Sequence, residues 1–174
     1  DRKVTGGQGR VVETIARYWE PVIKIYGSNL KTGLAGMSIS FTGEQLGQVM
    51  VILTKSGVQR FEMMGLTRSE SGRFHLLLIV DPDYCRDAVE SVLAVIGNER
   101  EIECSVQHGM ELLFFHGPHF QDRYGVIHAA VSALAKASID ITCAACSGTG
   151  VHLVAQEGIG VRMLEELGEV FVVP

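Results

Sequence analysis

The fold is decided by a stretch that occurs twice in the chain: residues 46–58 read LGQVMVILTKSGV, and residues 127–139 read IHAAVSALAKASI. The apolar residues of the first copy have the spacing of one helix face: Leu46, Val49, Met50 and Leu53. Each has an apolar counterpart 81 residues later, and the lysine that closes the helical pattern recurs at the same offset. The chain therefore contains an internal repeat, and the segments on either side of each copy predict the fold.

The segments that flank the repeated helix follow the same order in both copies. Around the first copy, the pattern predicts a strand over 37–41, a hairpin over 61–66 and 74–80, a helix that begins at Asp81, and a strand over 101–106. Around the second copy, it predicts a strand over 112–115, a hairpin over 141–146 and 151–155, a short helix over 161–167 and a strand over 170–173. Each copy has the order β-α-β-β-α-β. This order predicts an α+β fold of two ferredoxin-like units, each an antiparallel sheet with two helices on one face.

The repeat divides the chain into three segments. Residues 1–35 form an N-terminal segment with a glycine-rich, flexible start, a helix over 10–20 and a short strand that ends in a turn at 27–29. Residues 36–108 form the first unit, and residues 109–174 form the second. A unit of roughly 70 residues has a marginal core on its own, so we expect the two units to pack against each other.

The composition favours a globular domain without nucleic-acid or membrane partners. The 174 residues are 47% hydrophobic and 20% charged, and the formal charge is −5. The longest aliphatic stretch, Leu76 to Val80, is far shorter than the roughly 20 residues that a spanning helix needs. Four cysteines do not make a disulfide framework in a chain of this size, so we expect a cytoplasmic protein. The chain begins at Asp1 without an initiator methionine or secretory signal, and we expect it to be a piece of a longer polypeptide.

The loop before the second repeated helix, residues 120–128, contains the most informative polar residues. Asp122 is placed to cap the helix, and Gly125 allows the backbone to approach a ligand closely. The N-terminus of a helix attracts a carboxylate, and a nearby aspartate attracts an ammonium group. Together these charges match the head group of a free α-amino acid. The plainer alternative is an ordinary helix start with a glycine in its first turn.

The same loop carries a family resemblance. Residues 122–126, DRYGV, followed by ALAKASIDI at 133–141, resemble the pattern D-x-x-G-V…A-L-A-x-A-G-I-N-I of ACT domains, most closely the tandem pair at the carboxyl end of aspartokinases. The resemblance is good over 110–154 and extends weakly through the repeat over 36–108. It implies a ferredoxin-like fold that binds an amino acid at a domain interface. In aspartokinases, the usual effectors are lysine and threonine.

The resemblance also implies which residues would form the site. By position, the effector loop would consist of Asp122, Arg123, Tyr124, Gly125 and Val126. The adjoining strand edge would consist of Ile139, Asp140 and Ile141. These eight positions are the candidate effector-binding residues.

The sequence departs from the family pattern at two positions and in the first unit. Ser138 stands where the family often has glycine, and Asp140 where it often has asparagine. Because a carboxylate accepts hydrogen bonds but does not donate them, the effector's identity is open. The equivalent loop of the first unit, residues 42–45, is shorter and lacks the D-x-x-G motif, so we expect that unit to complete the interface without a site of its own.

The resemblance implies a regulatory module and not a catalyst. The chain contains neither a Walker phosphate-binding motif nor the lysine- and glycine-rich opening motif of an aspartokinase catalytic domain, and we expect no cofactor. We expect a homodimer that senses a free amino acid and biases a catalytic kinase domain in the same or a partner chain. The alternative is a non-catalytic dimerisation or interaction scaffold that binds no ligand.

A zinc site is the competing interpretation of the cysteines. Cys143 and Cys146, with His116 and His119, would supply two thiolates and two imidazoles as ligands. Cysteines three apart in a strand point to opposite faces, however, and cannot bind one ion together. We therefore expect buried thiols and no metal.

Overall fold

The computed structural model describes residues 22–58, 60–96, 99, 101–118, 120–121 and 123–172. The helix predicted over 10–20 lies outside this part of the chain, as does Asp122. The elements in chain order are β1 (Ile23–Lys24), β2 (Gly27–Phe41), the 3-10 turn η1 (Gly43–Gln45), α1 (Leu46–Lys55), β3 (Met63–Arg68), β4 (Phe74–Val80), α2 (Pro82–Ile96), β5 (Glu103–His116), α3 (Val126–Lys136), β6 (Cys143–Ser147), β7 (Gly150–Gln156), α4 (Gly160–Gly168) and β8 (Phe171–Val172). No helix among them is long and apolar enough to cross a membrane.

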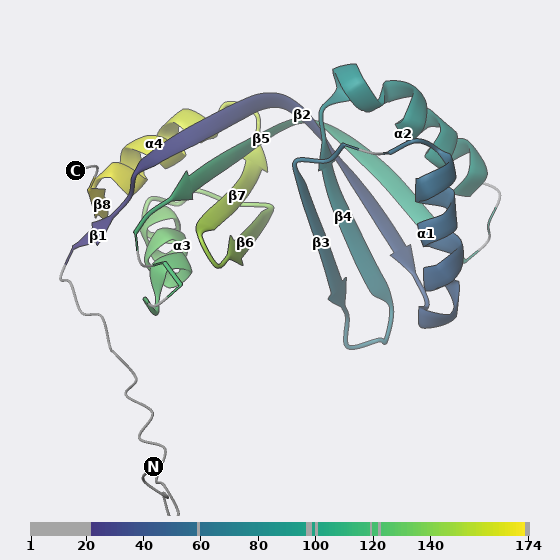
Figure 1. Ribbon diagram of the computed structural model, residues 1–174, viewed down its shortest axis with the longest axis horizontal. Helices are drawn as coiled ribbons and strands as arrows, with labels where there is room; N and C mark the ends of the chain where they lie inside the picture. The colour runs from purple at the N-terminus through teal and green to yellow at the C-terminus, as the bar shows by residue number, and fades with distance from the viewer. Residues whose placement is uncertain are drawn as a thin grey trace, which may run out of the picture.

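Six strands form one antiparallel sheet in the order β3-β4-β2-β5-β7-β6. The two longest strands, β2 and β5, lie in the middle of this sheet and extend from one half of the molecule into the other (Figure 1). The first half consists of β3, β4, α1 and α2 with residues 35–41 and 103–108 of the long strands. The second half consists of β6, β7, α3 and α4 with residues 27–31 and 110–116. Each half has a ferredoxin-like strand order, which confirms the predicted α+β class.

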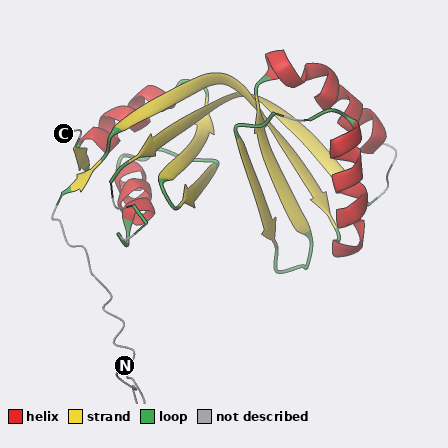
Figure 2. Ribbon diagram, in the orientation of Figure 1, coloured by secondary structure: helices red, strands yellow, loops and turns green. Residues whose placement is uncertain are grey.

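The sheet bends into an arch whose outer side carries the helices (Figure 2). Strands β3 and β4 of the first half face β6 and β7 of the second half across the inside of the arch. Each helix pair packs on its own half. The first core cluster joins β2 to α1 and α2, through residues that include Met37, Ile39, Val49, Leu53 and Val92. The second joins β5 and β7 to α3 and α4, through residues that include Leu113, Leu153, Ala130, Leu134 and Met163.

A third cluster lies on the inner, helix-free side of the sheet. It contains buried residues from both halves: Leu34, Met63, Ile79, Met110, Leu112 and Val154. Because burial of apolar side chains is favourable, the cluster holds the two halves together at the bend. The expectation that the two units pack together is confirmed by this cluster.

Two glycines mark the bend where the long strands cross from one half to the other. Gly33 has φ +70° and Gly109 has φ +68°, a region that favours glycine. The register between β2 and β5 shifts beside them, from Lys31 opposite Leu112 to Ala35 opposite His108. Such bulges bend a strand and increase its twist, so they turn the sheet at this boundary.

The structure corrects three details of the predicted elements. The turn predicted at 27–29 is strand, and the strands predicted over 101–106 and 112–115 are both parts of β5. The strand predicted over 170–173 is the two-residue β8, which pairs in parallel with β1 and not with β5. Residues 27–31 take the place beside β5, because they pair with it over five positions, whereas β8 offers only two.

The predicted repeat is visible in the ends of the two corresponding helices. Helix α1 ends at Lys55 and α3 at Lys136, which are 81 residues apart. Two residues beyond each of these lysines, the backbone is left-handed: Gly57 has φ +78° and Ser138 has φ +54°. Both helices therefore end in the same way, and only the second does so without a glycine.

Candidate functional site

The predicted effector loop connects the end of β5 to the start of α3. Gly125 has φ +85° and occupies the N-cap position of α3. The N-cap is therefore Gly125 and not Asp122 as predicted, because the helix begins at Val126, four residues beyond Asp122. The glycine has no heavy atom within 4 Å of an added Cβ, so its left-handed backbone and not crowding requires glycine here.

The loop is fastened to the N-terminal strand. The guanidinium of Arg123 donates a hydrogen bond from Nη1 to the carbonyl oxygen of Val22, at 2.9 Å. At Gly117, a Cβ would lie 2.3 Å from the carbonyl oxygen of Lys24 and 2.5 Å from the ring of Phe120. Only glycine allows this close approach, which places the loop directly against β1.

The predicted site residues divide into a buried and an exposed group. Val126 and Ile139 are buried in the second core cluster, and Ile141 packs against it. Tyr124 is 88% exposed, and Asp140 is also exposed. The apolar members thus anchor the loop and the strand edge in one core, while Tyr124 and Asp140 face solvent.

The first amide groups of α3 are the chemical feature that suits an anion. The leading N–H groups of a helix have no acceptor within the helix and carry the positive end of its dipole. Gly125 supplies no side chain to satisfy them. A carboxylate could therefore bind here. Asp140 follows the C-terminal end of α3, so the length of the helix, about 16 Å, separates its carboxylate from these amide groups in the same chain.

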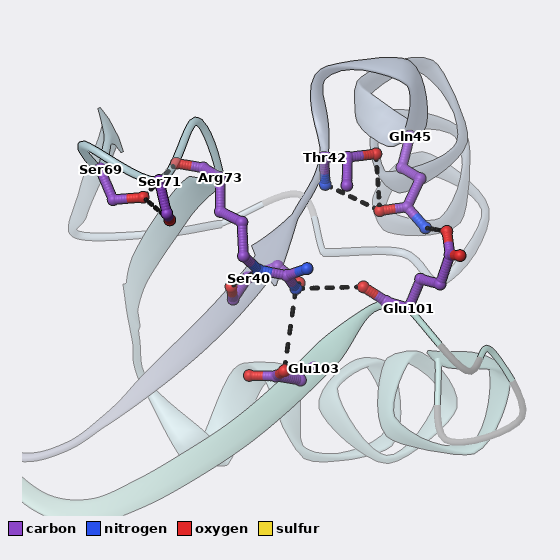
Figure 3. A network of polar contacts seen from close by, with 8 residues as sticks. All are labelled: Ser40, Thr42, Gln45, Ser69, Ser71, Arg73, Glu101 and Glu103. Carbon is purple, nitrogen blue, oxygen red and sulfur yellow. Dashed lines mark hydrogen bonds and ion pairs between the residues drawn. The ribbon is translucent and has the colours of Figure 1, made fainter.

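The equivalent end of the first half is closed by its own polar contacts (Figure 3). The side-chain oxygen of Gln45 accepts hydrogen bonds from the backbone N–H of Thr42, at 2.8 Å, and from its hydroxyl, at 3.1 Å. Arg73 donates to the Ser40 hydroxyl and carbonyl, each at 3.0 Å, and to the Glu101 carbonyl at 3.1 Å. These groups bind one another, so this end of the first half offers less to a ligand than the start of α3.

The two cysteines of the zinc interpretation are not the buried thiols that we expected. Cys143 and Cys146 lie in strand β6, the first half-buried and the second exposed. Burial raises the pKa of Cys143, and it raises the pKa of Cys104 to about 11. His119 lies outside the described residues. Within the described part of the chain, no three His, Cys, Asp or Glu side chains are grouped so that they could hold a metal.

Two further polar groups lie outside the predicted site. Glu111 is only 6% exposed, and its carboxylate accepts a hydrogen bond from the N–H of Gly160, the first residue of α4. His152 of β7 lies on the inner side of the sheet, with its ring 4.7 Å from that of Phe114. Burial lowers the pKa of His152, so its neutral form is favoured. Strand periodicity alone does not distinguish such residues from ordinary surface positions.

Comparisons with known proteins identify the fold. The regulatory subunit of aspartate kinase from Thermus thermophilus, in its ligand-free form, superimposes with a TM-score of 0.72 at 16% identity, over 85% of this chain and 99% of that one. The subunit from Thermus flavus gives a TM-score of 0.71 at 16% identity, over 84% and 98%. Aspartokinase III from E. coli, in complex with lysine and aspartate, superimposes with a TM-score of 0.60 at 12% identity, over 87% of this chain and 34% of that one. No protein-family model and no curated protein sequence matches the chain.

These matches confirm the predicted resemblance at the level of the fold. The chain has the tandem architecture of aspartate kinase regulatory regions, and it covers nearly the full length of the two Thermus subunits.

Proposed function

We propose that the chain is a regulatory module that binds a free amino acid and controls an attached or partner catalytic domain. The observation that carries the proposal is the shared tandem fold: two ferredoxin-like halves built on common long strands, as in the regulatory subunits of aspartate kinase. We propose lysine or threonine as the first effectors to test. Lysine is named for the E. coli aspartokinase III complex that shares the fold.

We place the effector at the start of α3. The left-handed Gly125 leaves the first amide groups of α3 without a side-chain partner from the N-cap, which favours the carboxylate of an amino acid. The ammonium group would bind the carboxylate of Asp122 and, across a dimer interface, that of Asp140 from a second copy, because Asp140 follows the opposite end of α3. Arg123 and Tyr124 would line the entrance, and the apolar residues Val126, Ile139 and Ile141 would hold the two walls in place.

The mechanism we propose is a shift between two arrangements of the module. An effector that contacts two units at once binds one relative orientation better than another, and so increases its population. A homodimer in the cytoplasm would bring a second copy to the site, and a kinase domain would respond to the new orientation. The chain itself would supply binding and no chemistry.

An alternative function is an interaction scaffold without a ligand. It is favoured by the exposed apolar side chains near the edge strand β3: Phe61, Met64 and Leu66, each about half exposed. Such an edge can pair with another chain. The scaffold would associate equally well with and without amino acids, whereas the regulatory module would not.

The test is a calorimetric titration of the chain with lysine and with threonine. We expect saturable binding of at least one, and a loss of about tenfold or more in affinity for Asp140→Ala, which removes a charged hydrogen-bond partner. Asp87→Ala, an exposed carboxylate on α2 in the other half, is the matched control and should bind normally. Undiminished affinity in Asp140→Ala and Asp122→Ala would refute the assigned site, and no binding of any amino acid would favour the scaffold.

A further inference from the structure

We propose that the inner angle between the two halves is a second binding site, for a small α-amino acid with an apolar side chain. The site lies on the helix-free side of the sheet, away from the loop before α3, and does not depend on the function proposed for that loop. It is a cavity of about 270 Å³ with these lining residues: Asn29, Lys31, Glu62, Leu112, Phe114 and His152.

The floor of the cavity is built by two rows of residues across the second half. Asn29, Phe114 and His152 lie opposite one another on β2, β5 and β7. Lys31 and Leu112 lie opposite one another in the next row towards the bend. Residues directly opposite in antiparallel strands share a face of the sheet, so all five side chains point to the inside of the arch.

The wall of the cavity comes from the other half. Glu62 directly precedes β3, and its backbone N–H donates to the carbonyl oxygen of Ile79 at 2.7 Å. Its carboxylate binds Lys31 Nζ at 2.5 Å, across the inside of the arch. The cavity is therefore shared between the two halves, and a ligand in it contacts both.

The charges of the lining match a zwitterion. Lys31 carries a positive charge and Glu62 a negative one, while the lowered pKa of His152 favours a neutral ring. The two charges cancel, so a ligand with a single charge would pair with only one of the two side chains. A ligand with both an α-carboxylate and an α-ammonium group pairs with both.

The ligand would enter by opening the ion pair. The side chains of Lys31 and Glu62 are 46% and 28% exposed, and an ion pair of this kind contributes little to stability. The carboxylate of the ligand would then bind Lys31, and its ammonium group Glu62. Its side chain would lie on the apolar floor formed by Leu112 and the Phe114 ring.

The size of the cavity suits an amino acid or a molecule of similar size. Sites for drug-sized ligands occupy roughly 300–1,000 Å³, and this cavity lies just below that range. Gly150 leaves room for the Phe114 ring of the floor, because a Cβ at residue 150 would lie 2.4 Å from the ring. The glycine thus preserves the aromatic surface on which the ligand side chain packs.

The experiment is an NMR titration of the ¹⁵N-labelled chain with alanine, valine, leucine and methionine. We expect at least one to cause saturable shifts in the amide signals of Asn29, Lys31 and His152. The carboxylate 4-methylpentanoate and the amine 3-methylbutylamine each lack one charge of leucine, and we expect each to bind about tenfold more weakly or less.

Variants of nearly equal size separate this site from the loop before α3. Lys31→Met and Glu62→Gln each remove one charge, and we expect each to weaken binding about tenfold or more while the spectrum stays that of a folded chain. Asp140→Ala is the control and should leave these shifts unchanged. The proposal is overturned if no amino acid shifts these signals, if both charge variants bind normally, or if the shifts occur only at residues 123–126 and 139–141.

Discussion

Replacing Ser138 by glycine should stabilise the protein. Ser138 follows α3 with φ +54°, the one non-glycine residue with positive φ among the described residues. Its side chain is exposed, so removing the side chain creates no cavity. The left-handed conformation costs a residue with a Cβ roughly 1–2 kcal/mol, and glycine is free of that cost.

The net gain is smaller, because glycine also has more freedom in the unfolded chain. That freedom costs roughly 0.5–1 kcal/mol on folding, and the difference between the middle values of the two ranges is a gain of about 0.75 kcal/mol for Ser138→Gly. For a chain of 150–250 residues, each kcal/mol raises Tm by about 2–4 °C, so we expect a rise of about 1.5–3 °C. Differential scanning calorimetry at neutral pH measures this directly.

The repeat provides matched controls for the same substitution. Gly57→Ser places serine at the equivalent position after α1, where φ is +78° and no atom lies within 4 Å of an added Cβ, so Tm should fall by a similar amount. Ser56→Gly changes the preceding residue, whose φ of −75° suits any side chain, and should lower Tm. A Ser138→Gly variant no more stable than wild type, with Gly57→Ser also neutral, would refute the argument.

Three further variants test other parts of the structure. Glu111→Gln should lower the free energy of unfolding by about 1 kcal/mol in urea titrations, because the charge that binds the N-terminus of α4 is lost; no change would show that the charge is not needed. Gly109→Ala should cost about 1–2 kcal/mol in the same assay, since φ is +68° and the new Cβ would lie 3.0 Å from the Glu157 carboxylate. Because burial lowers the pKa of His152, this histidine binds a proton in the unfolded chain at a higher pH than in the folded chain. The contribution of the neutral ring to the free energy of unfolding is therefore complete above pH 6.5 and decreases as the pH falls below it. We expect His152→Gln to reduce this loss between pH 7 and pH 5, with the exposed His128→Gln as control, and an unchanged pH profile would contradict the assignment.

The parts of the fold that local patterns determine were predictable. The apolar helix face from Leu46 to Leu53 recurs at Ile127 to Leu134, because each of the two helices covers one face of a similar half of the sheet. The hairpins β3–β4 and β6–β7 follow from alternating strands around polar turns. Short-range spacing carries this information, so the α+β class and the order of elements could be derived from it.

The parts that depend on distant pairing could not be derived in the same way. Residues around Gly109 read as a break between two strands, whereas the glycine is a bulge within β5. Residues 27–29 read as a turn, yet they pair with β5, which is more than 80 residues away. A local pattern does not distinguish a bulge from a turn, because the partner strand decides between them.

The candidate site was predictable only in part. Gly125 was singled out because it would let the backbone approach a ligand, and the structure gives it a left-handed backbone at the N-cap of α3. The capping role of Asp122 was wrong, since α3 begins further along the chain. The inner cavity was missed altogether, because Lys31, Glu62 and His152 come from three separate segments and meet only when the sheet bends.

The most direct test of the account is a titration of the intact chain with lysine and threonine, followed by calorimetry. The account predicts saturable binding of at least one of them, weakened about tenfold or more by Asp140→Ala and unchanged by Asp87→Ala. A chain that releases no heat with either amino acid, and whose Tm is unaffected by any of the twenty, would contradict a regulatory amino-acid site and leave the interaction scaffold as the better explanation.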